Sequence, residues 1–326
     1  MADKYAMPTR VHTRINPFLS IPLTILWISL YNTIMNDAFS PRLRDVPAPA
    51  SLTDVRDKMF NSLRTTSLAP MINEISRAIG GGKMLRAKLT LTLGMASGAN
   101  REDLIRAAAA VEMVHAASLL HDDVVDGGML RRGAPTFWQE KSVSGAILLG
   151  DLLVCRAVQM MEEIENRRLG GLLVRMSAEM CDAEVEQELI TRGAPGDWDK
   201  SVSMIRRKTG SLFAFAAAAA DGVNGPRSDA LMEAGYQLGT AFQMADDLMD
   251  ASGKGELDGK DLGQDAARGK LTSVSACNMD QARARQCVTA LCHSSSEMLA
   301  PWPPVQAAWQ AYLKSDMGPV INKFLS

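Results

Sequence analysis

Long apolar stretches with helical periodicity constrain the fold of this chain more than any other feature. A first helix begins at Ser51, where Ser51 and Asp54 form a capping-box pattern, and runs towards Ile79. The later stretches are separated by glycine, proline or polar residues and cover about residues 84–97, 101–126, 139–165, 169–191, 197–221, 227–251, 271–298 and 305–324. Aromatic residues make up only 5% of the sequence, and no convincing strand pattern occurs. We therefore predict an all-α fold in which residues 51–326 form a single large helical bundle.

The charge balance argues against one broad class of function. The sequence has 35 lysines and arginines against 37 aspartates and glutamates, which gives a formal net charge of −2. A protein that wraps a polyanion needs a positive excess, so we predict no nucleic-acid partner. The five cysteines are scattered and show neither a disulfide framework nor a zinc-binding spacing. This cysteine pattern predicts a reduced, intracellular protein.

The N-terminal segment, residues 1–50, differs from the rest of the chain. Ile15–Asn36 contains no charged residue, follows several basic residues and has the length of a membrane span. Pro17 and Pro22 interrupt this stretch, and polar side chains dilute it. We predict that it packs as a helix on this protein or on an oligomer partner. A membrane anchor is the alternative.

The motif Asp-Asp-x-x-Asp occurs twice, at residues 122–126 and 246–250, each time at the end of a strongly apolar stretch. On a helix, the first and last aspartates of this motif share one face, where two carboxylates repel each other unless a cation lies between them. Carboxylate oxygens without clustered Cys or His favour Mg²⁺, which typically binds one or two carboxylates plus substrate phosphates. We predict metal ligands at Asp122, Asp123, Asp126, Asp246 and Asp250, with Asp247 as a further catalytic residue.

Basic residues occur beside both motifs and after a glycine break. Lys83 and Arg86 follow glycines 80–82 at the start of a helix, whose amide N–H groups would favour an anion. Together with two metal clusters, such cations predict a site for two diphosphates. The further cations are Arg131 and Arg132 after the first motif, Lys208 within an apolar helix, and Lys260 and Lys270 around the glycine-rich loop after the second motif.

These segments resemble the trans-isoprenyl diphosphate synthases, also called polyprenyl synthetases. The resemblance covers about Ser51–Ala300 in the family's order of motifs. It implies an all-α bundle around a deep central cavity, usually a homodimer. We predict a cytoplasmic protein with membrane association as an alternative. The segments that carry it are GGKMLR (81–86), EMVHAASLLHDDVVDGGMLRRGAPT (112–136), ILLGDLL (147–153), IRRKTGSLF (205–213), GTAFQMADDLMD (239–250) and GKDLGQDAARGKLT (259–272).

The resemblance implies a Mg²⁺-dependent transferase of isoprenoid biosynthesis. Three Mg²⁺ ions on the aspartate motifs would bind an allylic diphosphate and help its C–O bond ionise. Isopentenyl diphosphate then attacks the allylic cation, and loss of a proton gives a product five carbons longer. Thr209 and Gln243 would steady the developing cation. By position, Lys83, Arg86, His115 and Arg132 would hold isopentenyl diphosphate, and Arg131, Lys208, Lys260 and Lys270 would hold the allylic diphosphate.

The resemblance also bears on product length. In this family the residues four and five positions before the first aspartate line the path of the growing chain, and bulky aromatic residues there stop it early. Here these residues are Ser118 and Ala117, whose small side chains predict an open channel and a product of geranylgeranyl length (C20) or longer. Candidates for a floor formed by a later helix are Met160, Met161 and Met176.

Two alternative functions stay open. A non-catalytic regulatory subunit would share the fold, but such subunits usually lose one aspartate motif, and both motifs are intact here. A class I terpene cyclase also carries an aspartate-rich motif, but it normally has an Asn/Ser/Glu metal motif instead of the second one and needs no isopentenyl site. Consumption of isopentenyl diphosphate distinguishes the synthase from both.

Overall fold

A computed structural model of the protein describes residues 48–223, 225–252, 272–276 and 280–325. Pro49–Ser326 belongs to one compact unit. The apolar stretch Ile15–Asn36 and the loop cations Lys260 and Lys270 lie outside the described residues. What the sequence predicts for them therefore stays a prediction.

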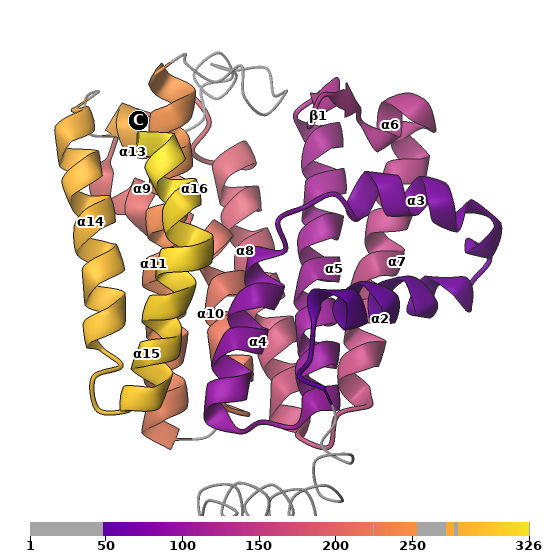
Figure 1. The fold of residues 1–326 in the computed structure, drawn as a ribbon. Coiled ribbons are helices and arrows are strands. Elements are labelled where there is room, and N and C mark those ends of the chain that lie inside the picture. The colour runs from indigo at the N-terminus through magenta and orange to yellow at the C-terminus, as the bar shows by residue number, and fades with distance from the viewer. Residues whose placement is uncertain (1–47, 224, 253–271, 277–279, 326) are drawn as a thin grey trace, which may run out of the picture. The chain divides into compact units, whose positions relative to one another are not determined.

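Helices form nearly all of the regular structure in the described part of the chain (Figure 1). The all-α prediction is confirmed. In chain order the elements are α2 (Leu52–Arg64), η1 (Ala69–Met71), α3 (Ile72–Ile79), α4 (Leu85–Ser97), α5 (Arg101–Val125), β1 (Leu130–Arg131), β2 (Ala134–Pro135), α6 (Phe137–Glu140), α7 (Val143–Glu162), α8 (Arg167–Leu189), α9 (Trp198–Ile205), η2 (Arg206–Gly210), α10 (Ser211–Ala219), α11 (Gly225–Ser252), α13 (Ser273–Ala276), α14 (Gln281–Glu297), α15 (Pro303–Tyr312), η3 (Leu313–Met317) and α16 (Gly318–Leu325).

The first described helix begins where the sequence predicts. Ser51 and Asp54 form the expected capping box, in which each side chain accepts a hydrogen bond from the other residue's amide group. The prediction that this helix continues to Ile79 is wrong, because α2 ends at Arg64 and the chain passes through η1 before α3. Two threonine hydroxyls at the end of α2 donate to carbonyls of its last turn, which satisfies acceptors that a helix end leaves unpaired.

Three of the predicted long helices are divided in the structure. The stretches 197–221 and 305–324 each contain a five-residue π turn, η2 and η3 respectively. A π turn shifts the helical register and is frequent at functional sites. The stretch 271–298 contains α13 and α14 separately, and the side chain of Asp280 caps the start of α14 by accepting from two amide groups.

The segment after α5 contains the one pair of strands in the described residues, which the sequence analysis missed. Leu130 pairs with Pro135 and Arg131 with Ala134 in a two-residue antiparallel hairpin. Arg132 and Gly133 at its tip have φ angles of 54° and 75°, as a tight hairpin turn with two left-handed residues requires. The hairpin is too short for a periodicity signal.

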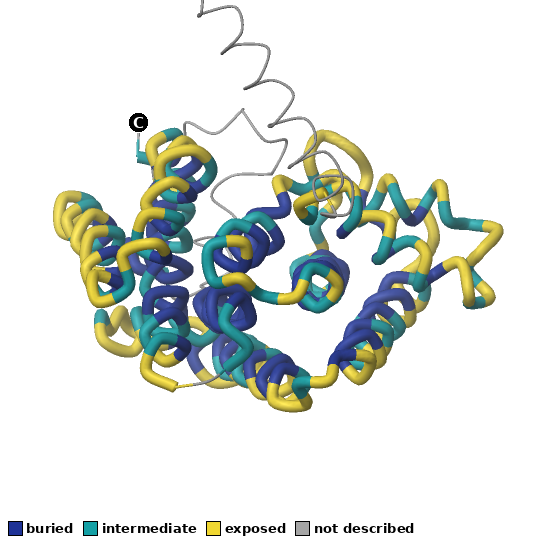
Figure 2. Tube along the Cα trace, turned by 60° about the horizontal axis from the view of Figure 1, so that its bottom comes forward, coloured by how far each residue is buried: buried dark blue, intermediate teal, exposed yellow. Residues whose placement is uncertain are grey.

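The second aspartate helix, α11, packs directly against the backbone of η2 and α10. α10 is buried along its whole length, and buried segments face inward in Figure 2. A Cβ atom on Gly239 would lie 2.6 Å from Cα of Gly210, and one on Gly235 would lie 2.5 Å from the carbonyl oxygen of Phe213. Glycine at both positions therefore allows an approach that a side chain would prevent, and this approach places α11 beside η2.

Candidate active site

The first aspartate motif lies at the C-terminal end of α5. The helix starts at Asn100, whose side chain accepts from two amide groups, and Asp126 caps its end. Carbonyl groups give the last turn of a helix a partial negative charge, so carboxylates are unfavourable there without a cation. Asp122 and Asp126 are nevertheless both placed in this turn and are half-buried. The local electrostatics therefore favour a bound cation.

The middle aspartate of this motif is engaged differently. The Asp123 side chain is only 9% exposed and pairs with Arg131 from the hairpin. Nε of Arg131 lies 2.9 Å from each carboxylate oxygen of Asp123, and Nη2 lies 2.6 Å from Oδ1. The sequence analysis groups Asp123 with the metal ligands, whereas in the structure its carboxylate binds a guanidinium group.

The second motif shows the same division on α11. Asp246 and Asp250 are half-buried, and Asp247 is buried. Asp247 accepts hydrogen bonds from Nε2 of Gln243 at 3.0 Å and from both the amide and the hydroxyl group of Ser273 at 2.9 Å. Burial raises the pKa of Asp247 to about 6, and these hydrogen bonds oppose the rise.

Both motifs lie at the same end of the bundle. In Figure 1 the end of α5, marked by β1, and the end of α11, marked by α13, are at the top. Asp122 also acts electrostatically on Cys181 of α8, so α8 borders the first motif. The arrangement brings acidic groups from two distant segments to one region.

The π turn η2 places two predicted site residues next to α11. Thr209, which is buried, donates a hydrogen bond to Oε1 of Gln243 at 2.9 Å. The Gln243 amide group donates to Asp247 at the same time, so its orientation is fixed from both sides. The structure thus brings together Thr209 and Gln243, for which the resemblance implies one shared role.

Lys208, also in η2, is held by α8. Its Nζ donates to Oε1 of Gln187 at 2.8 Å and forms an ion pair with Glu184. Sequence analysis did not identify these two partners.

The residues predicted to bind isopentenyl diphosphate converge from three segments. Nη1 and Nη2 of Arg132 lie against the glycine loop, 3.3 and 3.2 Å from the positions that Cβ atoms would take on Gly81 and Gly82. The glycines thus leave room for this guanidinium group. Lys83, in the same loop, is exposed, and its Nζ lies 5.9 Å from the ring centre of Phe324.

Arg86 and His115 lie deeper than Lys83. Arg86 is buried, and its guanidinium group lies 4.6 Å from the ring centre of Phe213. His115 is half-buried on α5, two helical turns before Asp122. The structure therefore gathers the predicted residues Lys83, Arg86 and Arg132 around one loop, with His115 on the helix of the first motif.

The sequence analysis expected the amide groups at the start of α4 to favour an anion. In the structure a carboxylate of the protein itself binds two of them. The carboxylate of Glu112, on α5, accepts from the amide of Ala87 at 2.9 Å and also binds the amide of Arg86. Glu112 went unnoticed in the sequence, although an acidic residue within the apolar run 107–120 is an unusual feature.

Of the two predicted chain-length residues, Ala117 lies in the apolar core and Ser118 is half-buried beside it. Ala117 is buried, and the Ser118 hydroxyl donates to the carbonyl oxygen of His115 at 2.9 Å. Met160, Met161 and Met176 are buried in the same cluster as Ala117. The sulfur of Met176 also accepts from the hydroxyl of Tyr236 at 3.1 Å. Which of these side chains limits the product stays a prediction.

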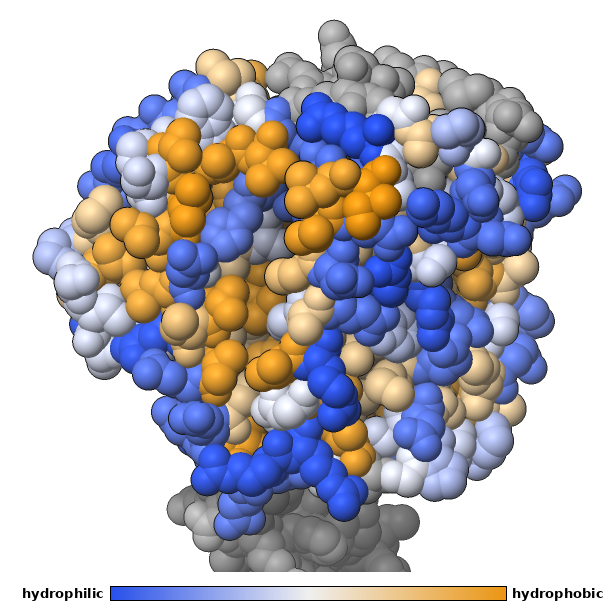
Figure 3. Space-filling view, turned by 180° about the vertical axis from the view of Figure 1, so that it is seen from behind, coloured by the Kyte–Doolittle hydropathy of each residue, from blue (hydrophilic) through white to orange (hydrophobic). Residues whose placement is uncertain are grey.

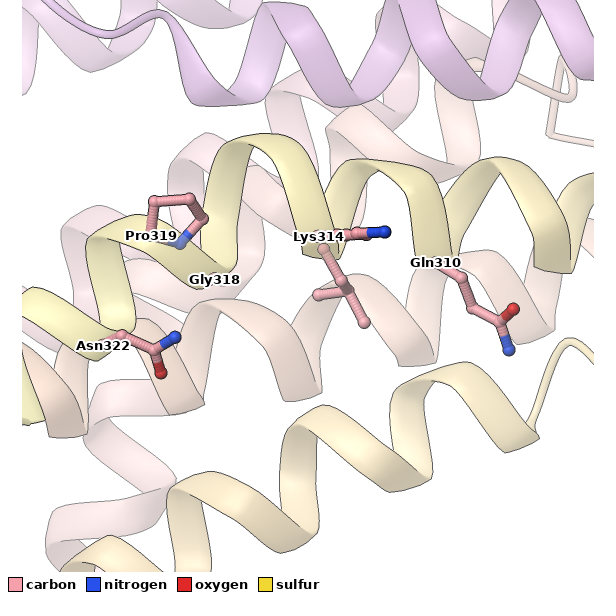
Figure 4. Close-up of a pocket in the computed structure, with 6 residues that line it drawn as sticks. Gln310, Lys314, Gly318, Pro319 and Asn322 are labelled. Carbon is pink, nitrogen blue, oxygen red and sulfur yellow. The ribbon is translucent and has the colours of Figure 1, made fainter.

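Two surface cavities lie away from these groups. One, of about 440 Å³, is formed by α15, η3 and α16 and includes Gln310, Lys314 and Asn322 (Figure 4). The other, of about 270 Å³, lies between the start of α5 and the ends of neighbouring helices. None of the predicted site residues lines either cavity.

Metal binding can be judged from the donor groups alone. Among the described residues, no three His, Cys, Asp or Glu side chains lie close enough together to hold a metal ion by themselves. Mg²⁺ commonly takes only one or two protein carboxylates and completes its shell with phosphate oxygens and water. The paired carboxylates of each motif fit that requirement.

Comparison with known proteins identifies the family. The family model for polyprenyl synthetases matches residues 69–298. An octaprenyl diphosphate synthase from Haemophilus influenzae is 34% identical over 208 residues, which cover 62% of this chain and 63% of that protein. A geranylgeranyl diphosphate synthase from Methanosarcina mazei is 34% identical over 203 residues, which cover 60% of this chain and 62% of that protein. The chain thus spans less than two thirds of the length of each of these relatives.

The fold gives the same result. The crystal structure of a decaprenyl diphosphate synthase from Rhodobacter capsulatus superposes with a TM-score of 0.72 at 25% sequence identity. The superposition covers 89% of this chain and 98% of that one. Since the family model covers most of the chain and the motifs lie where the fold brings them together, the protein belongs to the polyprenyl synthetase family.

Proposed function

We propose that this protein condenses isopentenyl diphosphate head to tail with an allylic diphosphate and makes an all-trans polyprenyl diphosphate of C20 or longer. The observation that carries the proposal is the pair of aspartate motifs at one end of the bundle. In each motif the first and last carboxylates are half-buried and the middle one is buried. Lys83, Arg86 and Arg132, around the glycine loop, would bind the second diphosphate.

The metal in this proposal is Mg²⁺, three ions per site as in the family. Asp122 and Asp126 would hold it from α5, and Asp246 and Asp250 from α11. Bound Mg²⁺ neutralises the diphosphate and stabilises the charge that develops as it leaves. Asp123 and Asp247 would act as positioning residues, since each already binds a group of the protein.

Thr209 and Gln243 would stabilise the allylic cation. Their oxygens lie 2.9 Å apart in a hydrogen bond, and both oxygens retain lone pairs. The Gln243 amide group donates to Asp247, which keeps the carbonyl oxygen directed at Thr209. Preorganised dipoles of this kind stabilise developing charge without reorganisation.

Arg131 would bind the allylic diphosphate while it keeps its pair with Asp123. A guanidinium group has five N–H donors, and the pair uses only those on Nε and Nη2. Lys208, Lys260 and Lys270 would add further positive charge. When the substrate binds, Nζ of Lys208 would donate its hydrogen bond to a phosphate oxygen instead of to Gln187.

The product length follows from the small residues Ala117 and Ser118 and is supported by the relatives. Those relatives make geranylgeranyl and octaprenyl diphosphates, and the structural neighbour is a decaprenyl diphosphate synthase. We therefore propose C20 as the lower limit.

The test is direct. Purified protein is incubated with Mg²⁺, isopentenyl diphosphate and, separately, dimethylallyl, geranyl and farnesyl diphosphates, and the dephosphorylated products are sized. We expect chains of four or more isoprene units that disappear with chelator. Failure to consume isopentenyl diphosphate with every primer would contradict the proposal and favour a cyclase or a subunit that needs a partner.

A homodimer is part of the proposal. By length and composition α7 could cross a membrane or form the core of a soluble protein, but its most apolar part is only 33% buried. Figure 3 shows broad apolar areas on one face of the molecule. Large apolar surfaces of this kind mark interaction sites. The exposed large hydrophobic residues of α7 and α8 are Val143, Ile147, Leu148, Val174, Val185 and Leu189.

Light scattering tests this part of the proposal. We expect a molar mass of twice the chain mass of 35.3 kDa. Replacement of Leu148, which is 66% exposed, by Asp should shift the protein towards the monomer without loss of helix content. A wild-type monomer would contradict the dimer.

The location in the cell is also proposed. We propose a cytoplasmic enzyme, with membrane contact through the N-terminal segment or the lipophilic product. Deletion of residues 1–50, followed by flotation with lipid vesicles, tests the first route. Equal binding of both forms would exclude the N-terminal segment as the contact.

A further inference from the structure

The start of α4 lacks a cap of its own. Its N-cap residue, Met84, has a left-handed backbone with φ 50° and ψ 46°, and its side chain makes no capping hydrogen bond. The first amide groups of a helix need acceptors, especially in a buried position. Lys83 and Arg86 flank this point, so its geometry sets the direction of both side chains.

Glu112 supplies the missing cap from the neighbouring helix α5. It lies on α5 and is 7% exposed, and Oε1 accepts from the amide of Ala87 at 2.9 Å. The carboxylate also binds the amide of Arg86. A negative charge at this position interacts favourably with the N-terminal end of the helix dipole.

The positive charges of two arginines also act on this carboxylate. Burial raises the pKa of Glu112, and the charges of Arg86 and Arg132 act in the opposite direction. Burial likewise lowers the pKa of Arg86, and the charge of Glu112 opposes it. The guanidinium group of Arg86 lies over the Phe213 ring, and its Nε is buried without a hydrogen-bond partner among the described residues.

We propose that Glu112 is a positioning residue of the isopentenyl diphosphate site, which holds the start of α4 and the guanidinium groups of Arg86 and Arg132 in one arrangement before the substrate arrives. The inference rests on the proposed function for the identity of the substrate. Glu112 itself touches no substrate. It acts on binding because two cations that would otherwise repel each other share one fixed counter-charge.

Glu112→Gln keeps the size of the side chain and one acceptor oxygen but removes the charge. The two arginines then lose their common partner, and the buried Arg86 must reorient. Glu102→Gln is the matched control, because it makes the same change on an exposed residue of the same helix. Glu112→Asp restores the charge on a shorter side chain and serves as the conservative variant.

Affinity is measured by isothermal titration of the full chain with isopentenyl diphosphate, and separately with geranyl diphosphate and Mg²⁺. We expect Glu112→Gln to weaken binding of isopentenyl diphosphate by about tenfold or more. Binding of geranyl diphosphate should stay within about twofold of wild type. Glu112→Asp should recover part of the loss, and Glu102→Gln should match wild type for both ligands.

Two outcomes would overturn the inference: unchanged affinity for isopentenyl diphosphate in Glu112→Gln, or an equal loss for both ligands. If Glu112→Gln does not fold, Glu112→Asp decides by the same comparison. Turnover of the wild type is scored separately. A wild type that binds both diphosphates but never joins them would refute the proposed reaction, and the titrations would still decide the role of Glu112.

Discussion

Replacement of Gly239 by alanine tests the contact that places the second aspartate helix. The new Cβ atom would lie 2.6 Å from Cα of Gly210, 3.0 Å from Cδ2 of Phe213 and 3.1 Å from N of Gly210. Ordinary carbon contacts begin near 3.5 Å, so α11 must move away from η2 by about 1 Å. Two of the three atoms belong to the backbone and cannot rotate aside.

The cost can be isolated with a matched variant. Gly171 is an exposed glycine within α8, and a Cβ atom there would meet nothing within 4 Å. Both replacements gain the same helix propensity, about 1 kcal/mol. The difference in unfolding free energy between the two variants therefore measures the steric conflict alone, and we expect Gly239→Ala to be the less stable by about 1–3 kcal/mol.

Activity should fall further than stability. Gln243 lies one helical turn after Gly239, and Thr209 directly precedes Gly210, so a shift between the helices stretches their 2.9 Å hydrogen bond. Misplacement by about 1 Å can cost about a hundredfold in rate. Urea unfolding at one protein concentration gives the stability difference, and consumption of isopentenyl diphosphate gives the rate. Equal stability of the two variants together with wild-type turnover of Gly239→Ala would refute the reasoning.

Three further predictions concern separate parts of the molecule. Asp122→Ala and Asp246→Ala should each remove most turnover and leave the circular dichroism spectrum unchanged, because each deletes a half-buried carboxylate rather than a core side chain; wild-type rates would contradict the metal role. Ala117→Phe should shorten the product, measured by chromatography of the dephosphorylated chains, and an unchanged distribution would place the limit elsewhere. Burial acts to raise the pKa of Asp316, but hydrogen bonds from Lys88 and Ser315 outweigh this effect and hold the pKa below its usual value of 3.8. Asp316→Asn should therefore lower stability by up to about 1 kcal/mol at neutral pH, and this difference should vanish as the pH falls through and below 3.8; a difference that persists at pH 2 would refute the ion-pair explanation.

The sequence predicted the fold class and most helix ends because those depend on local patterns. Ser51 and Asp54 form the predicted cap, and the stretches that became α4, α5 and α8 are bounded by glycine or polar residues. The π turns η2 and η3 were missed, since they continue the helix and differ from an α-helix only in register. The hairpin at Arg132 and Gly133 was missed because a two-residue strand has no periodicity.

The residues of the site were predicted better than their partners. Thr209 and Gln243, for which one shared role was predicted, are hydrogen-bonded to each other, whereas the predicted metal ligand Asp123 binds Arg131. Glu112 was overlooked entirely, because its role depends on α4 and α5 lying side by side. A sequence motif identifies side chains that share chemistry, whereas pairing across helices depends on packing that one sequence does not display.

Helix geometry nevertheless explains why the middle aspartate differs in both motifs. Successive residues on a helix are rotated by about 100°, so Asp122 and Asp126 lie about 40° apart, whereas Asp123 is turned about 100° from Asp122. One cation can contact the outer pair but not all three from the same side. The middle carboxylate therefore needs a hydrogen-bond partner within the protein, because a buried carboxylate without one would lower the stability of the fold considerably. Asp123 accepts hydrogen bonds from Arg131, and Asp247 accepts them from Gln243 and Ser273. These partners hold the last turn of each helix in place, so the outer carboxylates are directed before any ion binds.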